Sequence, residues 1–71
     1  MNIRNRIIEA LNNGRTIRRN TPTSIISYTK QTDGRVWCVR HFGMDSMRDE
    51  YISMETAVTR LMRNKKQIVF Q

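Results

Sequence analysis

Arginine carries the clearest chemical signal in this sequence of 71 residues. Ten of its thirteen basic residues are arginine and only six residues are acidic, which gives a formal net charge of +7. A guanidinium group presents a planar set of donors that matches phosphate oxygens and the edge of guanine. Arg15, Arg18 and Arg19 form the densest positive cluster. This composition favours nucleic acid as the ligand, bound first through its phosphates.

The positive charge is concentrated before residue 41. Residues 1–40 carry eight basic and two acidic side chains, a net charge of +6, whereas residues 41–71 carry five basic and four acidic ones. We therefore predict a nucleic-acid interface on the N-terminal part of the chain. Its predicted contact residues are Arg15, Arg18, Arg19, Lys30, Arg35, Arg40 and Trp37.

Aromatic residues of the same region allow two interpretations. If Tyr28 and Trp37 face solvent, they form a platform on which bases stack, at ~1–3 kcal/mol per base. If they face inward, they form a core with Ile26 and Val39 beneath the helices. Because tryptophan is usually highly buried, we favour the inward interpretation, and the side on which Trp37 lies stays open.

No catalytic or metal-binding constellation is evident. Cys38 and His41 are the only residues of their types, and three positions along a strand place two side chains on opposite faces. Two ligands are also too few for structural zinc. We interpret the four carboxylates of Asp45, Asp49, Glu50 and Glu55 as an acidic patch. We therefore expect a binding protein and not an enzyme, with no metal, cofactor or small-molecule substrate.

Two helices are predicted from apolar residues that recur with the helical period. The first covers residues 2–13, with Gly14 as its stop. The second begins after Ser53, a good N-cap residue. The apolar positions of the two helices are Ile3, Ile7, Ala10 and Leu11, and Met54, Ala57, Val58, Leu61 and Met62.

A β-hairpin is predicted over residues 24–42, because the runs 25–29 and 36–39 are rich in β-branched and aromatic residues. We place Asp33-Gly34 at the centre of a two-residue turn. That turn pairs Lys30 with Trp37, Tyr28 with Val39 and Ile26 with His41. Residues 15–24 are predicted to be a polar connector, and residues 47–52 a third strand at an edge.

The predicted fold is one α+β domain over residues 1–71. It contains a three-stranded antiparallel sheet, a β-meander, and two helices in the order α-β-β-β-α. For residues 67–71 two outcomes are open: a short additional strand, or a segment packed against the core.

The length of the chain, its short apolar runs and its single cysteine bear on its possible partners and on its cellular compartment. A chain this short buries about 60% of the surface that it exposes when unfolded, so a homodimer or a protein partner is an open alternative. The longest run of hydrophobic residues is Val36-Trp37-Cys38-Val39, too short to cross a bilayer, and the lone cysteine favours the cytoplasm.

The predicted function is that of a small regulatory protein that binds DNA or RNA. The alternative is a phage- or mobile-element-type accessory protein that binds a larger host protein and inhibits or redirects it.

Overall fold

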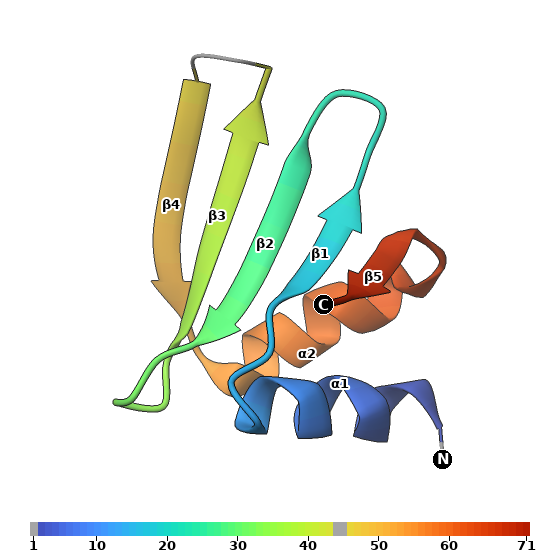
Figure 1. Ribbon diagram of the computed structural model, residues 1–71, viewed down its shortest axis with the longest axis vertical. Helices are drawn as coiled ribbons and strands as arrows, with labels where there is room; N and C mark the ends of the chain where they lie inside the picture. The colour runs from blue at the N-terminus through green and yellow to red at the C-terminus, as the bar shows by residue number, and fades with distance from the viewer. Residues whose placement is uncertain (1, 44–45) are drawn as a thin grey trace.

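Two helices lie against one face of a five-stranded antiparallel sheet in the computed structural model, which describes residues 2–43 and 46–71 (Figure 1). The strand order is β4-β3-β2-β1-β5. A short 3-10 helix, Lys65–Gln67, precedes the last strand. The other elements, in chain order, are α1 (Ile3–Asn12), β1 (Ile17–Asn20), β2 (Ile25–Lys30), β3 (Val36–Phe42), β4 (Ser46–Ile52), α2 (Met54–Arg63) and β5 (Ile68–Phe70).

Both predicted helices are confirmed. Asn2 caps α1, where its Oδ1 accepts a hydrogen bond from the Asn5 amide at 2.9 Å. Ser53 caps α2, where its hydroxyl accepts from the Thr56 amide at 3.1 Å. The buried stripes are Ile7, Ala10 and Leu11 on α1, and Ala57, Val58 and Leu61 on α2.

The prediction of a three-stranded sheet was wrong, because the sheet has five strands. The third predicted strand exists as β4, and of the two outcomes for the C-terminus the strand, β5, is the one formed. The additional strand is β1, within the segment predicted to be a connector. It lies between β2 and β5, so both of its sides form sheet ladders, and Ile17 is fully buried beneath the helices.

The predicted hairpin register was wrong by one residue. The Gly34 amide donates to the Gln31 carbonyl at 3.1 Å, and the Gln31 amide donates to the Arg35 carbonyl at 2.7 Å. The loop therefore contains three residues, 32–34, and Gly34 takes the left-handed conformation with φ of 92°. This is the loop in which a type I turn is followed by a glycine bulge.

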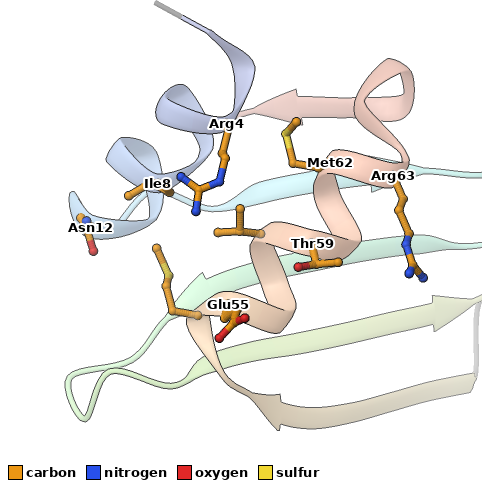
Figure 2. Close-up of a pocket in the computed structure, with 9 residues that line it drawn as sticks. Arg4, Ile8, Asn12, Glu55, Thr59, Met62 and Arg63 are labelled. Carbon is orange, nitrogen blue, oxygen red and sulfur yellow. The ribbon is translucent and has the colours of Figure 1, made fainter.

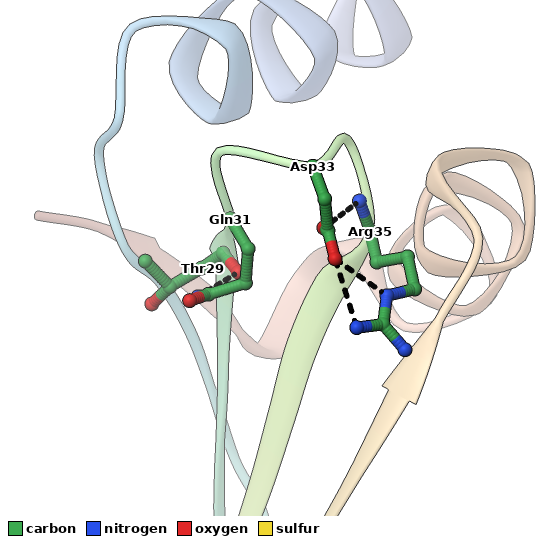
Figure 3. Close-up of polar contacts among 4 residues, drawn as sticks. All are labelled: Thr29, Gln31, Asp33 and Arg35. Atoms are coloured by element: carbon green, nitrogen blue, oxygen red, sulfur yellow. Dashed lines mark hydrogen bonds and ion pairs between the residues drawn. The ribbon is translucent and has the colours of Figure 1, made fainter.

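The loop is closed further by Asp33, whose carboxylate accepts from the amide of Arg35 at 3.0 Å and from its Nε at 2.8 Å (Figure 3). Tyr28 consequently pairs with Cys38, and Lys30 with Val36. Because the loop is one residue longer than predicted, every side chain of β3 lies on the face opposite to the one expected relative to β2.

This register decides the core. Ile26, Tyr28, Val36 and Cys38 face the helices and are buried with Ile17. Trp37 and His41, which the predicted register puts on the same face as Tyr28, lie on the helix-free face instead. Within the described residues, neither helix is long and apolar enough to cross a membrane.

Candidate anion-binding groove

The three clustered arginines of the sequence do not form one surface. Arg18 and Arg19 are neighbours in β1, so their side chains leave opposite faces of the sheet. Arg19 lies on the helix side, where its Nε donates to Oε1 of Gln67 at 2.9 Å. Arg15 precedes the strand, and its Nε donates to the Gln71 carbonyl at 2.7 Å. The expected cluster is therefore dispersed.

Two further predicted residues are engaged in contacts within the protein. Lys30 Nζ donates to Oδ1 of Asn12 at 2.8 Å. Arg35 forms an ion pair with Asp33 at 2.8 Å, and its guanidinium lies 4.6 Å from the centre of the Tyr51 ring.

Trp37 is half-buried on the helix-free face, so the predicted inward position was wrong. Its Nε1 donates to Oδ2 of Asp49 at 2.9 Å, which fixes the plane of the indole against β4.

Arg40 and Arg19, in contrast, belong to a common row across the helix side of the sheet. The register aligns Arg19 with Ile26, Ile26 with Arg40, and Arg40 with Arg48. Arg60 of α2 borders the same hollow. We call this hollow, of about 450 Å³, the arginine groove; its lining is Arg19, Tyr28, Cys38, Arg40, Phe42, Arg48, Asp49, Glu50 and Arg60.

The central feature of the arginine groove is a pair of like charges. Arg40 and Arg48 are direct cross-strand partners, and both are exposed. Like charges directly opposite each other destabilise a sheet. No carboxylate within the described residues forms an ion pair with either of them. Arg40 instead lies over the Phe42 ring, 5.6 Å from its centre.

The wall on the α2 side is held in place by an ion pair. Arg60 Nη1 donates to Oε1 of Glu50 at 2.6 Å. This hydrogen bond raises the pKa of Arg60 above its ordinary value. Glu50 is thereby occupied with Arg60, and it positions that guanidinium at the groove.

The floor of the groove is uncharged at neutral pH. Burial, together with the neighbouring Cys38, raises the pKa of Tyr28 to about 12. Burial also raises the pKa of the Cys38 thiol. The lining includes four arginines and two acidic residues, Asp49 and Glu50. The Asp49 carboxylate lies on the other face of the sheet, where it accepts from Trp37, and the Glu50 carboxylate is paired with Arg60. The chemistry of the groove suits an anion with several oxygen acceptors.

Neither Arg48 nor Arg60 was among the contact residues predicted from the sequence. Arg48 stands next to Asp49 and Glu50, so its charge is cancelled in any count along the chain. The alternation of β4, however, places Asp49 on the opposite face from Arg48. Arg60 lies on α2 one position before the buried Leu61, and only the packing of α2 on the sheet brings it to the groove.

A larger hollow of about 730 Å³ lies between the two helices (Figure 2). Ile8, Val58 and Met62 supply apolar surface to it, and Arg4 of α1 also lines it. It lacks a concentrated charge, because Glu55 shares the lining with Arg4 and Arg63. The arginine groove is therefore the stronger candidate for an ionic ligand.

Comparison with known proteins gave no match to a protein-family model, to a curated protein or to a solved structure. In the described part of the chain, no group of three or more His, Cys, Asp or Glu side chains is arranged to hold a metal ion.

Proposed function

We propose that this protein binds nucleic acid in the arginine groove, where Arg19, Arg40 and Arg48 contact backbone phosphates. The observation that carries the proposal is the direct pairing of Arg40 with Arg48. Two cations held directly opposite each other on neighbouring strands destabilise the fold. A phosphate placed between them turns that repulsion into two charge-assisted hydrogen bonds.

Surroundings of the groove favour a polymer over a small anion. The hollow is an open one, and its cationic row spans the sheet from Arg19 on β1 to Arg48 on β4. The whole chain adds a net charge of +7, which attracts polyanions over a distance. Small anions would need a more enclosed site to bind firmly.

Phe42 is the best candidate for a base-stacking group at this site. Its side chain is 38% exposed and lines the groove beside Arg40. Trp37, which the sequence offered for this role, lies on the other face with its indole N–H bonded to Asp49. We therefore assign stacking to Phe42, with phosphate contact to the arginines around it.

The test measures fluorescence anisotropy of short labelled oligonucleotides: single-stranded DNA, single-stranded RNA and duplex DNA. Wild-type protein is expected to bind at least one of them, with affinity that falls steeply between about 50 mM and about 200 mM salt. Absence of binding to all three at the lower salt concentration and micromolar protein would overturn the proposal.

A matched pair of double variants separates the groove from the net charge. Arg40→Gln/Arg48→Gln removes two groove cations, while Arg4→Gln/Arg63→Gln removes two cations that line the hollow between the helices. The groove variant is expected to lose at least about tenfold in affinity and to reduce the salt slope by about two. The control should lose much less. An equal loss in both would mean that net charge, and not the groove, determines binding.

An accessory protein that binds a larger host protein stays the alternative prediction. A single protein partner that survives nuclease treatment in a pull-down would favour that alternative over nucleic acid.

A further inference from the structure

The two edges of the sheet differ in length and exposure. β5 has three residues, and short edge strands resist pairing with other chains. β4 lies at the other edge (Figure 1). It has seven residues, of which only Ile52 is even partly buried. A long exposed edge is a template for a further strand.

The alternation of hydrogen-bonded pairs along antiparallel strands shows which backbone groups of β4 point to the free edge of the sheet. Gln31 and Arg35 form a hydrogen-bonded pair across the hairpin. Because such pairs alternate along antiparallel strands, Cys38 and Arg40 form their backbone bonds with β4. Their partners on β4 are the even-numbered residues. The N–H and C=O groups of Met47, Asp49 and Tyr51 therefore point to the free edge.

We propose that β4 pairs with β4 of a second copy of this chain, antiparallel and centred on Asp49. The strand spans Ser46–Ile52, so this register pairs all seven residues: Ser46 with Ile52, Met47 with Tyr51, Arg48 with Glu50, and Asp49 with itself. A two-fold axis perpendicular to the sheet relates the copies, and the product is a continuous ten-stranded sheet.

Side chains support this register on both faces. On the helix side, Arg48 of each copy faces Glu50 of the other, and opposite charges across strands are stabilising. On the other face, Met47 and Tyr51, which are 59% and 52% exposed, meet and bury apolar surface. The one unfavourable pair is Asp49 with Asp49, and each of these carboxylates already accepts from Trp37.

Neighbouring registers are poorer. A shift by two residues in one direction places Arg48 opposite Arg48, and in the other direction it places Glu50 opposite Glu50. In each of these two shifted registers only five residues of the strand are paired. A shift by one residue would bring side chains of opposite faces together, which antiparallel pairing does not allow. The sequence of β4 is therefore self-complementary in one register.

The two arginine grooves lie on the same side of the resulting sheet, because the two-fold axis preserves its faces. The dimer itself does not depend on nucleic acid. It is measured without any, so the two proposals fail independently of each other.

The proposed interface is tested with variants that reverse the charge at position 48 or position 50, and dimer formation is measured by analytical ultracentrifugation. Wild-type protein is expected to form a concentration-dependent dimer. Arg48→Glu alone and Glu50→Arg alone each place like charges across the seam twice, so each should raise the dimer dissociation constant at least about tenfold. In an equimolar mixture every substituted side chain faces an opposite charge, so the mixed dimer should form nearly as well as wild type.

The mixture also controls for damage within one copy. Glu50→Arg removes the ion pair with Arg60, and that loss persists in the mixture, so rescue there reports the seam alone. Wild-type protein that stays monomeric up to millimolar concentration would overturn the proposal. So would a mixture that associates no better than its components.

Disulfide cross-linking tests the register and does not depend on the charge variants. The Cα atoms of a hydrogen-bonded antiparallel pair lie about 5.5 Å apart, within disulfide range. Asp49→Cys should therefore form a covalent dimer under mild oxidation, while Cys38 stays buried. Tyr51→Cys should not, because two copies of position 51 lie about 13 Å apart along the strands. Equal cross-linking of both variants contradicts the register.

Discussion

The two faces of the sheet use the same strands for different purposes. On the helix side, Ile17, Ile26 and Tyr28 are at most 2% exposed beneath α1 and α2. On the other face, no helix within the described residues covers Trp37, Met47 and Tyr51. The helix side also carries the arginine groove, next to the covered core. The two helices cover only part of this face. The uncovered part can therefore carry the arginines of the groove, whose charges could not be buried in the core.

The largest expected difference between the faces concerns two adjacent isoleucines on β2. Ile26 is 1% exposed against the helices, whereas Ile25 is 41% exposed on the helix-free face. Ile26→Ala should lower the free energy of unfolding by about 2–5 kcal/mol, because it leaves a cavity in the core. Ile25→Ala should lower it by less than about 1 kcal/mol. Urea denaturation of the two variants measures both. Similar losses would mean that the helix-free face is also covered, for example by a second copy.

The next prediction concerns the pH dependence of stability, which depends on Tyr28, a buried residue on the helix side of the sheet. The pKa of Tyr28 is raised from 10.0 to about 12, first by burial and then by the nearby Cys38. Because the folded-state pKa lies above that of the unfolded chain, the stability supplied by the neutral phenol is complete below pH 10. It is lost as the pH rises through about 12.

We therefore expect urea midpoints to fall more steeply between pH 10 and 12 for wild type than for Tyr28→Phe. In a Tyr51→Phe background, absorbance of the tyrosinate ion reports Tyr28 alone. Ionisation of Tyr28 near pH 10 in the folded protein would contradict its position in the core.

A smaller effect is expected on the helix-free face, where Trp37 is anchored by one hydrogen bond. Trp37→Phe removes the 2.9 Å bond to Asp49 and part of the buried ring. The free energy of unfolding should fall by about 0.5–1.5 kcal/mol. Asp49→Asn keeps an acceptor for the indole N–H, so it should cost less. A larger cost for Asp49→Asn than for Trp37→Phe would show that the carboxylate has another partner.

Local signals in the sequence were sufficient for the two helices. The cap at Ser53 and the apolar period after it lie within one segment, so α2 could be predicted together with its first residue. The strand β1 could not, because three of its four residues are polar. Its stability comes from ladders with β2 and β5, and β5 lies about fifty residues away in the chain.

The candidate site was predictable only in part, for two physical reasons. Asp33-Gly34 fits both a two-residue and a three-residue loop, and that single residue decides on which face Trp37 and Arg40 lie. Arg48 was hidden beside acidic residues that the pleat places on another face or that pair elsewhere, as Glu50 does with Arg60. Counting charges along the chain therefore identified residues 1–40 as the basic part of the sequence, but it could not identify the arginine groove, which also takes residues from β4 and α2.

The smallest expected change in the free energy of unfolding comes from Arg48→Gln, and whether that change is a gain or a loss is the most informative result. Arg48→Gln should raise the free energy of unfolding by at most about 1 kcal/mol, because it removes a like charge directly opposite the exposed Arg40. Arg4→Gln changes the net charge equally at an exposed position of α1 and should leave stability nearly unchanged. Thermal unfolding at low ionic strength and low micromolar protein measures the difference, and added salt should reduce it. A variant that is more stable yet binds nucleic acid less well would mean that the arginine pair is kept for its ligand at the expense of the fold. A loss of stability in Arg48→Gln would show instead that Arg48 supports the sheet, and the case for the groove as a binding site would lose its central observation.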